Sequence, residues 1–467
     1  MKQEGSKLYL FSIVLVTIIG GLLFGYDTAV ISGAERALEA FFESGNFGYN
    51  KVWHGITASS ALIGCVIGGA LSGLLSTRWG RRNSLIFASA LFFLSALGSW
   101  RPEFLFFTYG EPTFGLMITF NLYRVLGGIG VGMASAICPM YIAEVAPAHL
   151  RGRLVSCNQF AIIFGMLVVY FINYMIRGNL GDTSEAIEAA MVSVGWRRMF
   201  VSEAFPAGLF GILLLTVPKT PRYLVLSGHD DKALTVLTKI NGLEKARAIL
   251  AEIKETSKEK TEKIFTYGVL VVIVGILLSF FQQAVGINVV LYYAPRIFEN
   301  MGAGSNAAMV QTVVMGVVNI IFTLVAIFTV DKLGRKPLLI TGSIGMCVGM
   351  IALSLLSFFN VIGVAALVFI IIYTAAFMMS WGPICWVLIS EIFPNTIRSK
   401  AVAIAVAAQW ITNFVVSSTF PSLSAWSVGG TYVIYAVFSL LSALFVWKWV
   451  PETKGKTLED MNKLWKK

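Results

Sequence analysis

Three charged side chains stand in stretches of sequence that are otherwise apolar. Asp27 lies in the run 8–31, which carries no other charge, and Arg124 and Glu203 lie in two further apolar runs. A charge at mid-membrane costs about 2.5–3.5 kcal/mol on insertion scales, so such residues are usually paired or functional. If Arg124 meets Asp27, the arginine favours the ionised carboxylate and desolvation favours the protonated one, so Asp27 can exchange its ion pair for a proton. The alternative is a fixed structural pair. Glu203 is either a proton relay or a hydrated carboxylate near a helix end.

Side-chain amides and indoles recur in the C-terminal apolar runs. The set is Gln282, Gln283, Asn288, Asn319, Trp386, Gln409 and Trp410. A neutral sugar has many hydroxyls and apolar ring faces, so its site needs amides, which both donate and accept hydrogen bonds, beside aromatic rings. Gln282 and Asn288 share a face only if their helix is broken, and Gly286 permits such a break. Phe24 and Tyr292 are expected to be apolar walls or gates. Alternatively, such amides bond to neighbouring helices and such tryptophans lie at bilayer interfaces.

The elements that carry these residues are predicted by composition. Hydrophobic residues make up 57% of the 467 residues and charged residues only 13%, against about a quarter charged in soluble domains. Stretches of about 20 apolar residues, the length that spans a bilayer, recur near 8–33, 54–76, 84–100, 116–142, 154–176, 197–217, 265–293, 306–329, 338–358, 361–389, 400–420 and 429–450. We therefore expect an all-α integral membrane protein of twelve transmembrane helices. The five cysteines have no metal-ligand spacing and no HExxH or nucleophile motif occurs, so no metal site, cofactor or enzyme is indicated.

Basic residues concentrate in alternate loops. They follow the second, fourth, eighth and tenth apolar stretches, whereas the loops 101–115 and 177–195 contain few. By the positive-inside rule both termini are cytoplasmic, and the connection 218–264 lies on the same side. The net charge of +11 is therefore explained by membrane topology, with lipid as the partner and without nucleic acid.

Two loop sequences repeat each other. EVAPAHLRGR and EIFPNTIRSK place Glu, Pro, Arg and a second basic residue at the same relative positions, and a Gly-Arg-basic triplet recurs at 80–82 and 334–336. Repeats in the same order predict two six-helix halves, 1–217 and 265–450, with a site between them near the bilayer midplane. The segment 218–264 is expected to form short cytoplasmic surface helices, and 451–467 a cytoplasmic tail.

Charged residues at the cytoplasmic ends of the predicted spans suggest a gate. They are Arg81, Glu144, Arg151, Arg222, Arg335, Glu391 and Arg398. Opposite charges there can bridge the halves in one conformation and separate in the other. The alternative is that they only fix topology.

The motifs RWGRR, DKLGRKP, PMYIAEVAPAHLRG and PETKGKTLED resemble those of the sugar porter family of the major facilitator superfamily, over nearly the whole chain. The resemblance implies the major facilitator fold, alternating access, a proton site at Asp27, and sugar contacts from the amide and indole set. It further implies a monomer in the inner (plasma) membrane. Three positions depart from the family pattern: Thr77 replaces Asp, Lys219 replaces Glu, and Met166 replaces a Gln that binds sugar hydroxyls.

The resemblance and the buried charges together favour a symporter that imports D-xylose or a related monosaccharide with a proton. A facilitative uniporter is the nearest alternative, and Asp27 argues against it. A membrane sugar sensor with impaired transport is a second alternative, which Met166 favours. An unpaired ligand hydroxyl at Met166 would cost about 1–3 kcal/mol of binding free energy.

Overall fold

The computed structural model describes residues 5–104, 106–256, 263–360 and 363–454, and every regular element among them is a helix. The first group, here called the N-terminal group, contains α1 (Lys7–Ala29), α2 (Ile31–Glu43), α3 (Lys51–Arg78), α4 (Arg81–Trp100), α5 (Phe114–Val145), α6 (Ala148–Gly178), α7 (Ser184–Ala190), a π-helical turn (Met191–Gly195), α8 (Trp196–Val201) and α9 (Ala204–Leu214). Three short helices follow: α10 (Pro221–Leu226), α11 (Asp230–Asn241) and α12 (Leu243–Thr256).

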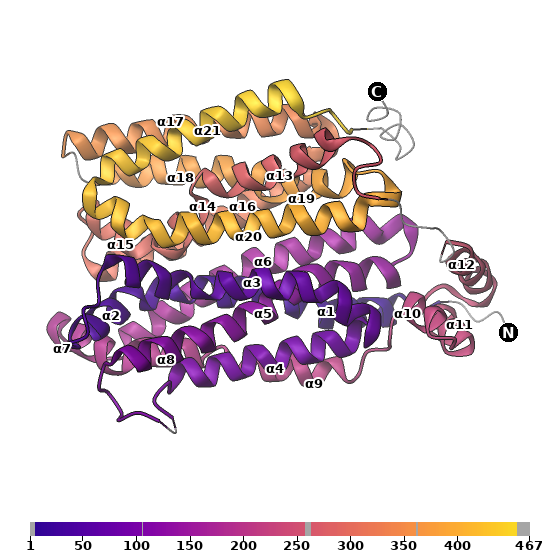
Figure 1. The fold of residues 1–467 in the computed structure, drawn as a ribbon, viewed down its shortest axis with the longest axis horizontal. Coiled ribbons are helices and arrows are strands. Elements are labelled where there is room, and N and C mark those ends of the chain that lie inside the picture. The colour runs from indigo at the N-terminus through magenta and orange to yellow at the C-terminus, as the bar shows by residue number, and fades with distance from the viewer. Residues whose placement is uncertain (1–4, 105, 257–262, 361–362, 455–467) are drawn as a thin grey trace.

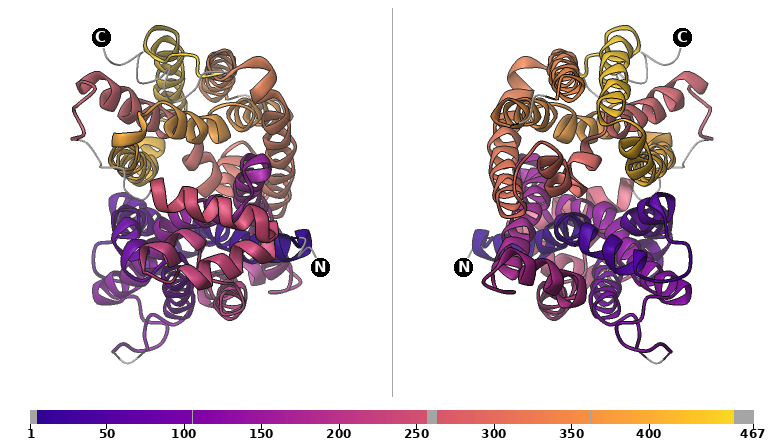
Figure 2. Two further views of the ribbon diagram at one scale, coloured as in Figure 1. Left: turned by 90° about the vertical axis from the view of Figure 1, so that its right-hand side faces the viewer. Right: turned by 90° about the vertical axis from the view of Figure 1, so that its left-hand side faces the viewer.

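The remaining helices form the C-terminal group. They are α13 (Val269–Ala284), α14 (Ile287–Tyr292), α15 (Ala294–Asn300), α16 (Ser305–Leu333), α17 (Arg335–Phe358), α18 (Val364–Met378), α19 (Trp381–Glu391), α20 (Asn395–Trp426) and α21 (Val428–Trp449). The two groups lie side by side with their helices roughly parallel to the long axis, and the views from both ends keep them apart (Figures 1 and 2).

The beginning of α1, the end of α21 and the helices α10 to α12 lie at one end of the bundle, which we call the terminal end (Figure 1). The opposite, distal end carries α2, α7 and α15. The expected short helices of the linker are therefore present and lie outside the main bundle. In α11 the apolar side chains Ala233, Val236, Leu237 and Ile240 are buried on one face, which is the pattern of a helix lying on a surface.

Eleven helices are long and apolar enough to cross a membrane, among the described residues. The predicted stretch 197–217 differs because it is divided into α8 and α9 by a turn at Ser202 and Glu203. Pro206 has no backbone N–H to donate to the carbonyl four residues earlier, which explains why the helix breaks there. The break leaves Glu203 at the junction of two short helices.

Small residues bring α3 and α5 into close contact. A Cβ atom on Gly128 would lie 1.8 Å from the carbonyl oxygen of Ala61, and one on Gly132 would lie 2.3 Å from that of Cys65. Such close packing through small residues one turn apart is typical of membrane helix pairs. This packing fixes α5, and with it Arg124, one turn before Gly128.

Candidate functional site

Asp27 and Arg124 meet in the interior of the N-terminal group. Arg124 Nη1 lies 2.6 Å from Asp27 Oδ1, and Nη2 donates to the Asp27 backbone carbonyl at 2.9 Å. The exposed fraction is 0% for Asp27 and 2% for Arg124. Gly127 leaves room for the carboxylate, since a Cβ there would lie 3.2 Å from Asp27 Oδ1. Two of the three charges that the sequence singled out, Asp27 and Arg124, are therefore in direct contact and buried within the protein.

Glu203 belongs to the same buried group. It is 1% exposed and interacts electrostatically with both Asp27 and Arg124. Glu203 is enclosed by protein in this conformation, because the break between α8 and α9 turns its side chain into the bundle, and the relay and the hydrated carboxylate both stay predictions. Both Glu203 oxygens and Asp27 Oδ2 have no hydrogen-bond partner among the described residues. Arg124 thus pairs with Asp27 alone, and Glu203 is a second buried carboxylate without an ion-pair partner among the described residues.

A cavity lies between the two helix groups and is lined by residues of both, and the space between helices of a bundle is a common location of small-molecule sites. Nine of the ten predicted substrate residues line it: Phe24, Met166, Gln282, Gln283, Asn288, Tyr292, Trp386, Gln409 and Trp410. The exception is Asn319, which is 1% exposed within α16 and does not line the cavity. In this conformation Asn319 lies on a face of α16 that packs against other helices. The sequence pattern did not show which face of α16 points toward the cavity.

The break at Gly286 aligns the amides, as the sequence predicted. Helix α13 ends at Ala284, Gly286 has φ +89°, and α14 begins at Ile287. A non-glycine residue is disfavoured in this left-handed conformation. A Cβ on Gly286 would also lie only 2.8 Å from the Tyr435 ring. The break brings Asn288 back to Gln283, to whose Oε1 its Nδ2 donates.

The cavity amides form one hydrogen-bonded chain. Gln282 Oε1 accepts from Gln409 Nε2 at 2.5 Å and from Gln283 Nε2 at 3.2 Å, while its own Nε2 donates to the Trp381 carbonyl at 3.0 Å. Gln409 Oε1 and Trp410 Nε1 have no partner among the described residues. A donor and an acceptor on neighbouring residues at the cavity are what a polyhydroxyl ligand can satisfy.

Aromatic rings complete the wall. Phe24 and Trp410 lie with centroids 5.6 Å apart and come from opposite helix groups. The Tyr292 hydroxyl accepts from Asn413 Nδ2 at 3.3 Å. Thr28, which also lines the cavity, directly follows Asp27 in α1.

Three polar lining residues were missed by the sequence reasoning: Thr28, Gln159 and Asn413. Helical spacing could have found two of them. Gln159 precedes Met166 by seven residues, and Asn413 follows Gln409 by four, so each shares a face with a residue that was singled out. Gln159 is the amide that the N-terminal group presents next to Met166.

The predicted gate residues lie at the terminal end, and the ion pairs seen there join residues of one helix group. Arg81 Nη2 lies 2.7 Å from Glu144 Oε1 in the N-terminal group, and Arg335 Nη2 lies 3.0 Å from Glu391 Oε1 in the C-terminal group. Arg398 donates to a backbone carbonyl, and Arg151 and Arg222 are exposed. Bridging between the groups at this end stays a prediction for another conformation.

Ion pairs between the groups lie at the distal end. Arg296 of α15 pairs with Glu35 and Glu39 of α2, and Arg36 of α2 pairs with Glu299 of α15. The sequence reasoning did not select these residues. The spacing of Glu35 and Glu39, four apart on one helix face, was the available signal. In this conformation the two groups are thus tied together at the distal end.

A polytopic bundle of two helix groups around a central amide-lined cavity, with charges buried beside it, defines a membrane carrier for a small polar solute. Residues 13–465 match the family model described as sugar (and other) transporter, and the chain belongs to this family.

Relatives and a solved structure agree with this assignment. The chain is 50% identical to the D-xylose-proton symporter of Escherichia coli K12, over 100% of this chain and 97% of that protein. It is 38% identical to the glucose facilitated diffusion protein of Zymomonas mobilis, over 100% of this chain and 99% of that protein. An inward-open structure of the Escherichia coli xylose transporter XylE superposes with a TM-score of 0.87 at 50% identity, covering 98% of this chain and 100% of that one.

Proposed function

We propose that this chain is a proton-coupled symporter that imports D-xylose or a related monosaccharide by alternating access. The observation that carries the proposal is that α1 presents Phe24 and Thr28 to the amide-lined cavity and, between them, places Asp27 against Arg124. The Escherichia coli relative, half identical over its full length, is a D-xylose-proton symporter by name.

Charge balance supports a proton site at the buried group. Asp27 and Glu203 can carry two negative charges, whereas Arg124 supplies one positive charge. An unpaired buried charge is costly and is usually neutralised, so one carboxylate is expected to hold a proton. We assign Asp27 as the group that exchanges Arg124 for the proton, and Glu203 as a relay to it. A proton on Asp27 would release Arg124 and alter the free-energy difference between the two conformations.

The cavity chemistry supports a monosaccharide. We assign hydroxyl binding to Gln282, Gln283, Asn288, Gln409 and Trp410, since each presents an amide or indole to the cavity. Gln159 and Asn413 extend the set on opposite sides. Trp386, Phe24, Tyr292 and Met166 are assigned to apolar contacts with the sugar ring. Asn319 would reach the sugar only after α16 rotates or shifts.

We further propose that the bundle divides into rigid halves, 1–217 and 265–450, joined by 218–264. Both termini are assigned to the cytoplasm, because the basic loops lie at the terminal end. The distal end then faces outward, and this conformation is closed to the outside. In the opposite conformation, Glu144, Arg151, Glu391 and Arg398 are expected to pair across the terminal end.

Uptake into proteoliposomes tests the proposal. An inward-directed proton gradient should drive D-xylose accumulation by the wild type, whereas Asp27→Asn should bind and exchange xylose without accumulating it. Asp182→Asn, the same change at an exposed carboxylate, is the matched control and should accumulate normally. If Asp27→Asn still accumulates xylose under the gradient, coupling at Asp27 is excluded. If the wild type equilibrates xylose and ignores the gradient, the facilitative uniporter is correct, and binding without any flux would identify a sensor.

A further inference from the structure

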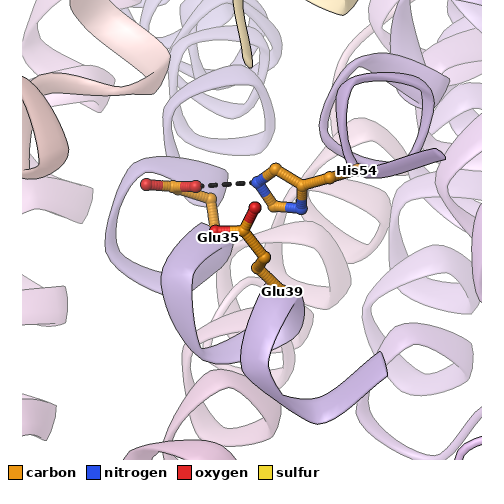
Figure 3. A group of neighbouring side chains, drawn as sticks. All are labelled: Glu35, Glu39 and His54. Atoms are coloured by element: carbon orange, nitrogen blue, oxygen red, sulfur yellow. Dashed lines mark hydrogen bonds and ion pairs between the residues drawn. The ribbon is translucent and has the colours of Figure 1, made fainter. Parts of the chain in front are cut away.

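A cluster of four ionisable side chains at the distal end has no part in the proposed sugar or proton sites. It consists of Glu35 and Glu39 of α2, His54 of α3 and Arg296 of α15, here called the distal cluster. His54 Nε2 lies 2.9 Å from Glu35 Oε2, and Arg296 Nε donates to Glu35 Oε1 at 2.8 Å. Figure 3 shows both carboxylates rising from one helix toward the imidazole. Glu35 and His54 are each 1% exposed, and Glu39 is 8% exposed.

The N-terminal group supplies three of these side chains, and the C-terminal group supplies the cation. Arg296 also pairs with Glu39, so one guanidinium is seated between two buried carboxylates. The other cation in contact is Lys51, whose Nζ lies 2.6 Å from Glu39 Oε1 and whose side chain is 45% exposed. The remaining ring nitrogen, His54 Nδ1, lies 3.2 Å from the Tyr49 hydroxyl. The pocket between the carboxylates is therefore already a cation site, filled by a residue of the other group.

Arg296 can fill this pocket only while the helix groups are together at the distal end. Alternating access requires them to part there, and α15 would then carry Arg296 away from α2 and α3. Glu35, Glu39 and His54 would remain on their own group, where Glu35 keeps His54 and Glu39 keeps Lys51. Losing the partner of a buried charge is strongly unfavourable, so the opened pocket would favour another cation.

The donor set identifies which cation fits. One ligand atom from each of Glu35, Glu39 and His54 lies within 4.8 Å of the other two. Ligands held about 2.1 Å from one tetrahedral ion lie roughly 3.4 Å apart, so side-chain rotation alone can bring the three together. Two carboxylates with one imidazole suit Zn²⁺ and its neighbours in the first transition row, whereas Mg²⁺ and Ca²⁺ prefer oxygen ligands throughout.

We propose that Glu35, Glu39 and His54 form a binding site for a divalent transition-metal ion such as Zn²⁺, and that the ion and the Arg296 guanidinium exclude each other. Metal binding then holds the distal end open and slows sugar uptake from the outside. Metal binding by the wild type and its effect on uptake rest on the proposed alternating access and orientation, whereas metal binding by a variant without Arg296 does not. No local sequence pattern indicates the site, because His54 is 19 residues from Glu35, in the next helix.

Titration calorimetry of the purified protein with Zn²⁺ tests the site without any transport assay. Arg296→Met removes the competing cation, so it should bind one Zn²⁺ more tightly than the wild type does. Even partners one step removed from a metal change its affinity by about 10- to 100-fold, so His54→Ala in the Arg296→Met background should weaken binding at least tenfold. His229→Ala in that background is the matched control, because His229 is an exposed histidine of the linker and should not matter.

Equal Zn²⁺ affinities with and without His54 in the Arg296→Met background would overturn the proposal. So would a wild type that binds as tightly as Arg296→Met. If Arg296→Met is too unstable for titration, xylose uptake with Zn²⁺ or Mg²⁺ added outside tests the site instead. Zn²⁺ should then inhibit the wild type at concentrations that leave His54→Ala unaffected, and equal inhibition of both would refute the site. A chain that proves not to transport would leave the calorimetric result intact.

Discussion

Replacing Met166 with glutamine tests whether the cavity binds hydroxyls as proposed. Met166 is 7% exposed and lines the cavity from α6, on the same face as Gln159 and about two turns away from it. An amide at this position adds a donor and an acceptor without much change in volume. One net hydrogen bond contributes about 0.5–1.5 kcal/mol, so the affinity for D-xylose should rise about 2- to 13-fold.

Isothermal titration of purified protein with D-xylose measures this change directly. Met166→Leu is the matched control, because leucine fills a similar volume without hydrogen-bonding groups, and its affinity should stay within about twofold of the wild type. Unfolding temperatures without sugar show whether either variant perturbs the packing of α6. If Met166→Gln folds normally but binds xylose no better than Met166→Leu, then no sugar hydroxyl lies within reach of position 166, and the sugar does not bind against this part of α6 as proposed.

Three further changes test other parts of the structure. Gln409→Leu should weaken xylose binding about 5- to 150-fold in the same titration, because a ligand hydroxyl is left unpaired; full affinity would remove Gln409 from the site. Gly286→Ala should lower both the unfolding temperature and xylose affinity, since its Cβ would lie 2.8 Å from Tyr435 at φ +89°, whereas Gly304→Ala, whose Cβ meets nothing within 4 Å, should do neither. Burial acts to raise the pKa of Glu452, but hydrogen bonds from backbone N–H groups, including those that begin α17, outweigh it and lower that pKa. The resulting stabilisation is present above the ordinary glutamate pKa of about 4.3 and is lost as the pH falls through the lowered value. Thermal unfolding should therefore show Glu452→Gln less stable than wild type at pH 7 and a shrinking difference below about pH 4; a pH-independent difference would contradict this role.

The positions of the long helices could be predicted from the sequence where the length of an apolar run was sufficient evidence. An apolar run long enough to span a bilayer has few alternatives to a helix, because its backbone groups must be satisfied internally. The break at Gly286 was predictable for a second reason, since two amides were out of phase on an unbroken helix. The break at Glu203 was not foreseen, because the run 197–217 reads as continuous, and Pro206 was its only local sign.

The site residues whose burial costs free energy could be predicted from the sequence. Residues whose contacts depend on how a helix is rotated could not. Asp27 and Arg124 stand out because an unpaired charge in hydrocarbon is unfavourable. Pairing the two charges lowers this free-energy cost, so their contact was expected. Asn319 was expected at the cavity on residue type alone, yet the rotation of α16 depends on packing across both helix groups. Arg296 and Glu35 are 261 residues apart, and no local pattern reports such a contact.

The placement of ion pairs along the bundle has an energetic consequence for transport. The pair Arg81–Glu144 lies within one helix group, so rigid rocking of the groups leaves it intact, and only Glu144 Oε2, which has no partner among the described residues, is available to pair across the terminal end. The pairs of Arg296 join the groups, so they stabilise only the conformation closed at the distal end. Breaking a buried pair without replacement costs about 3–5 kcal/mol, whereas a coupled ligand typically shifts such an equilibrium by about 1–3 kcal/mol. Sugar and proton can therefore drive the cycle only if new contacts form as these break, and exposed terminal-end cations such as Arg151 and Arg222 are available to make them.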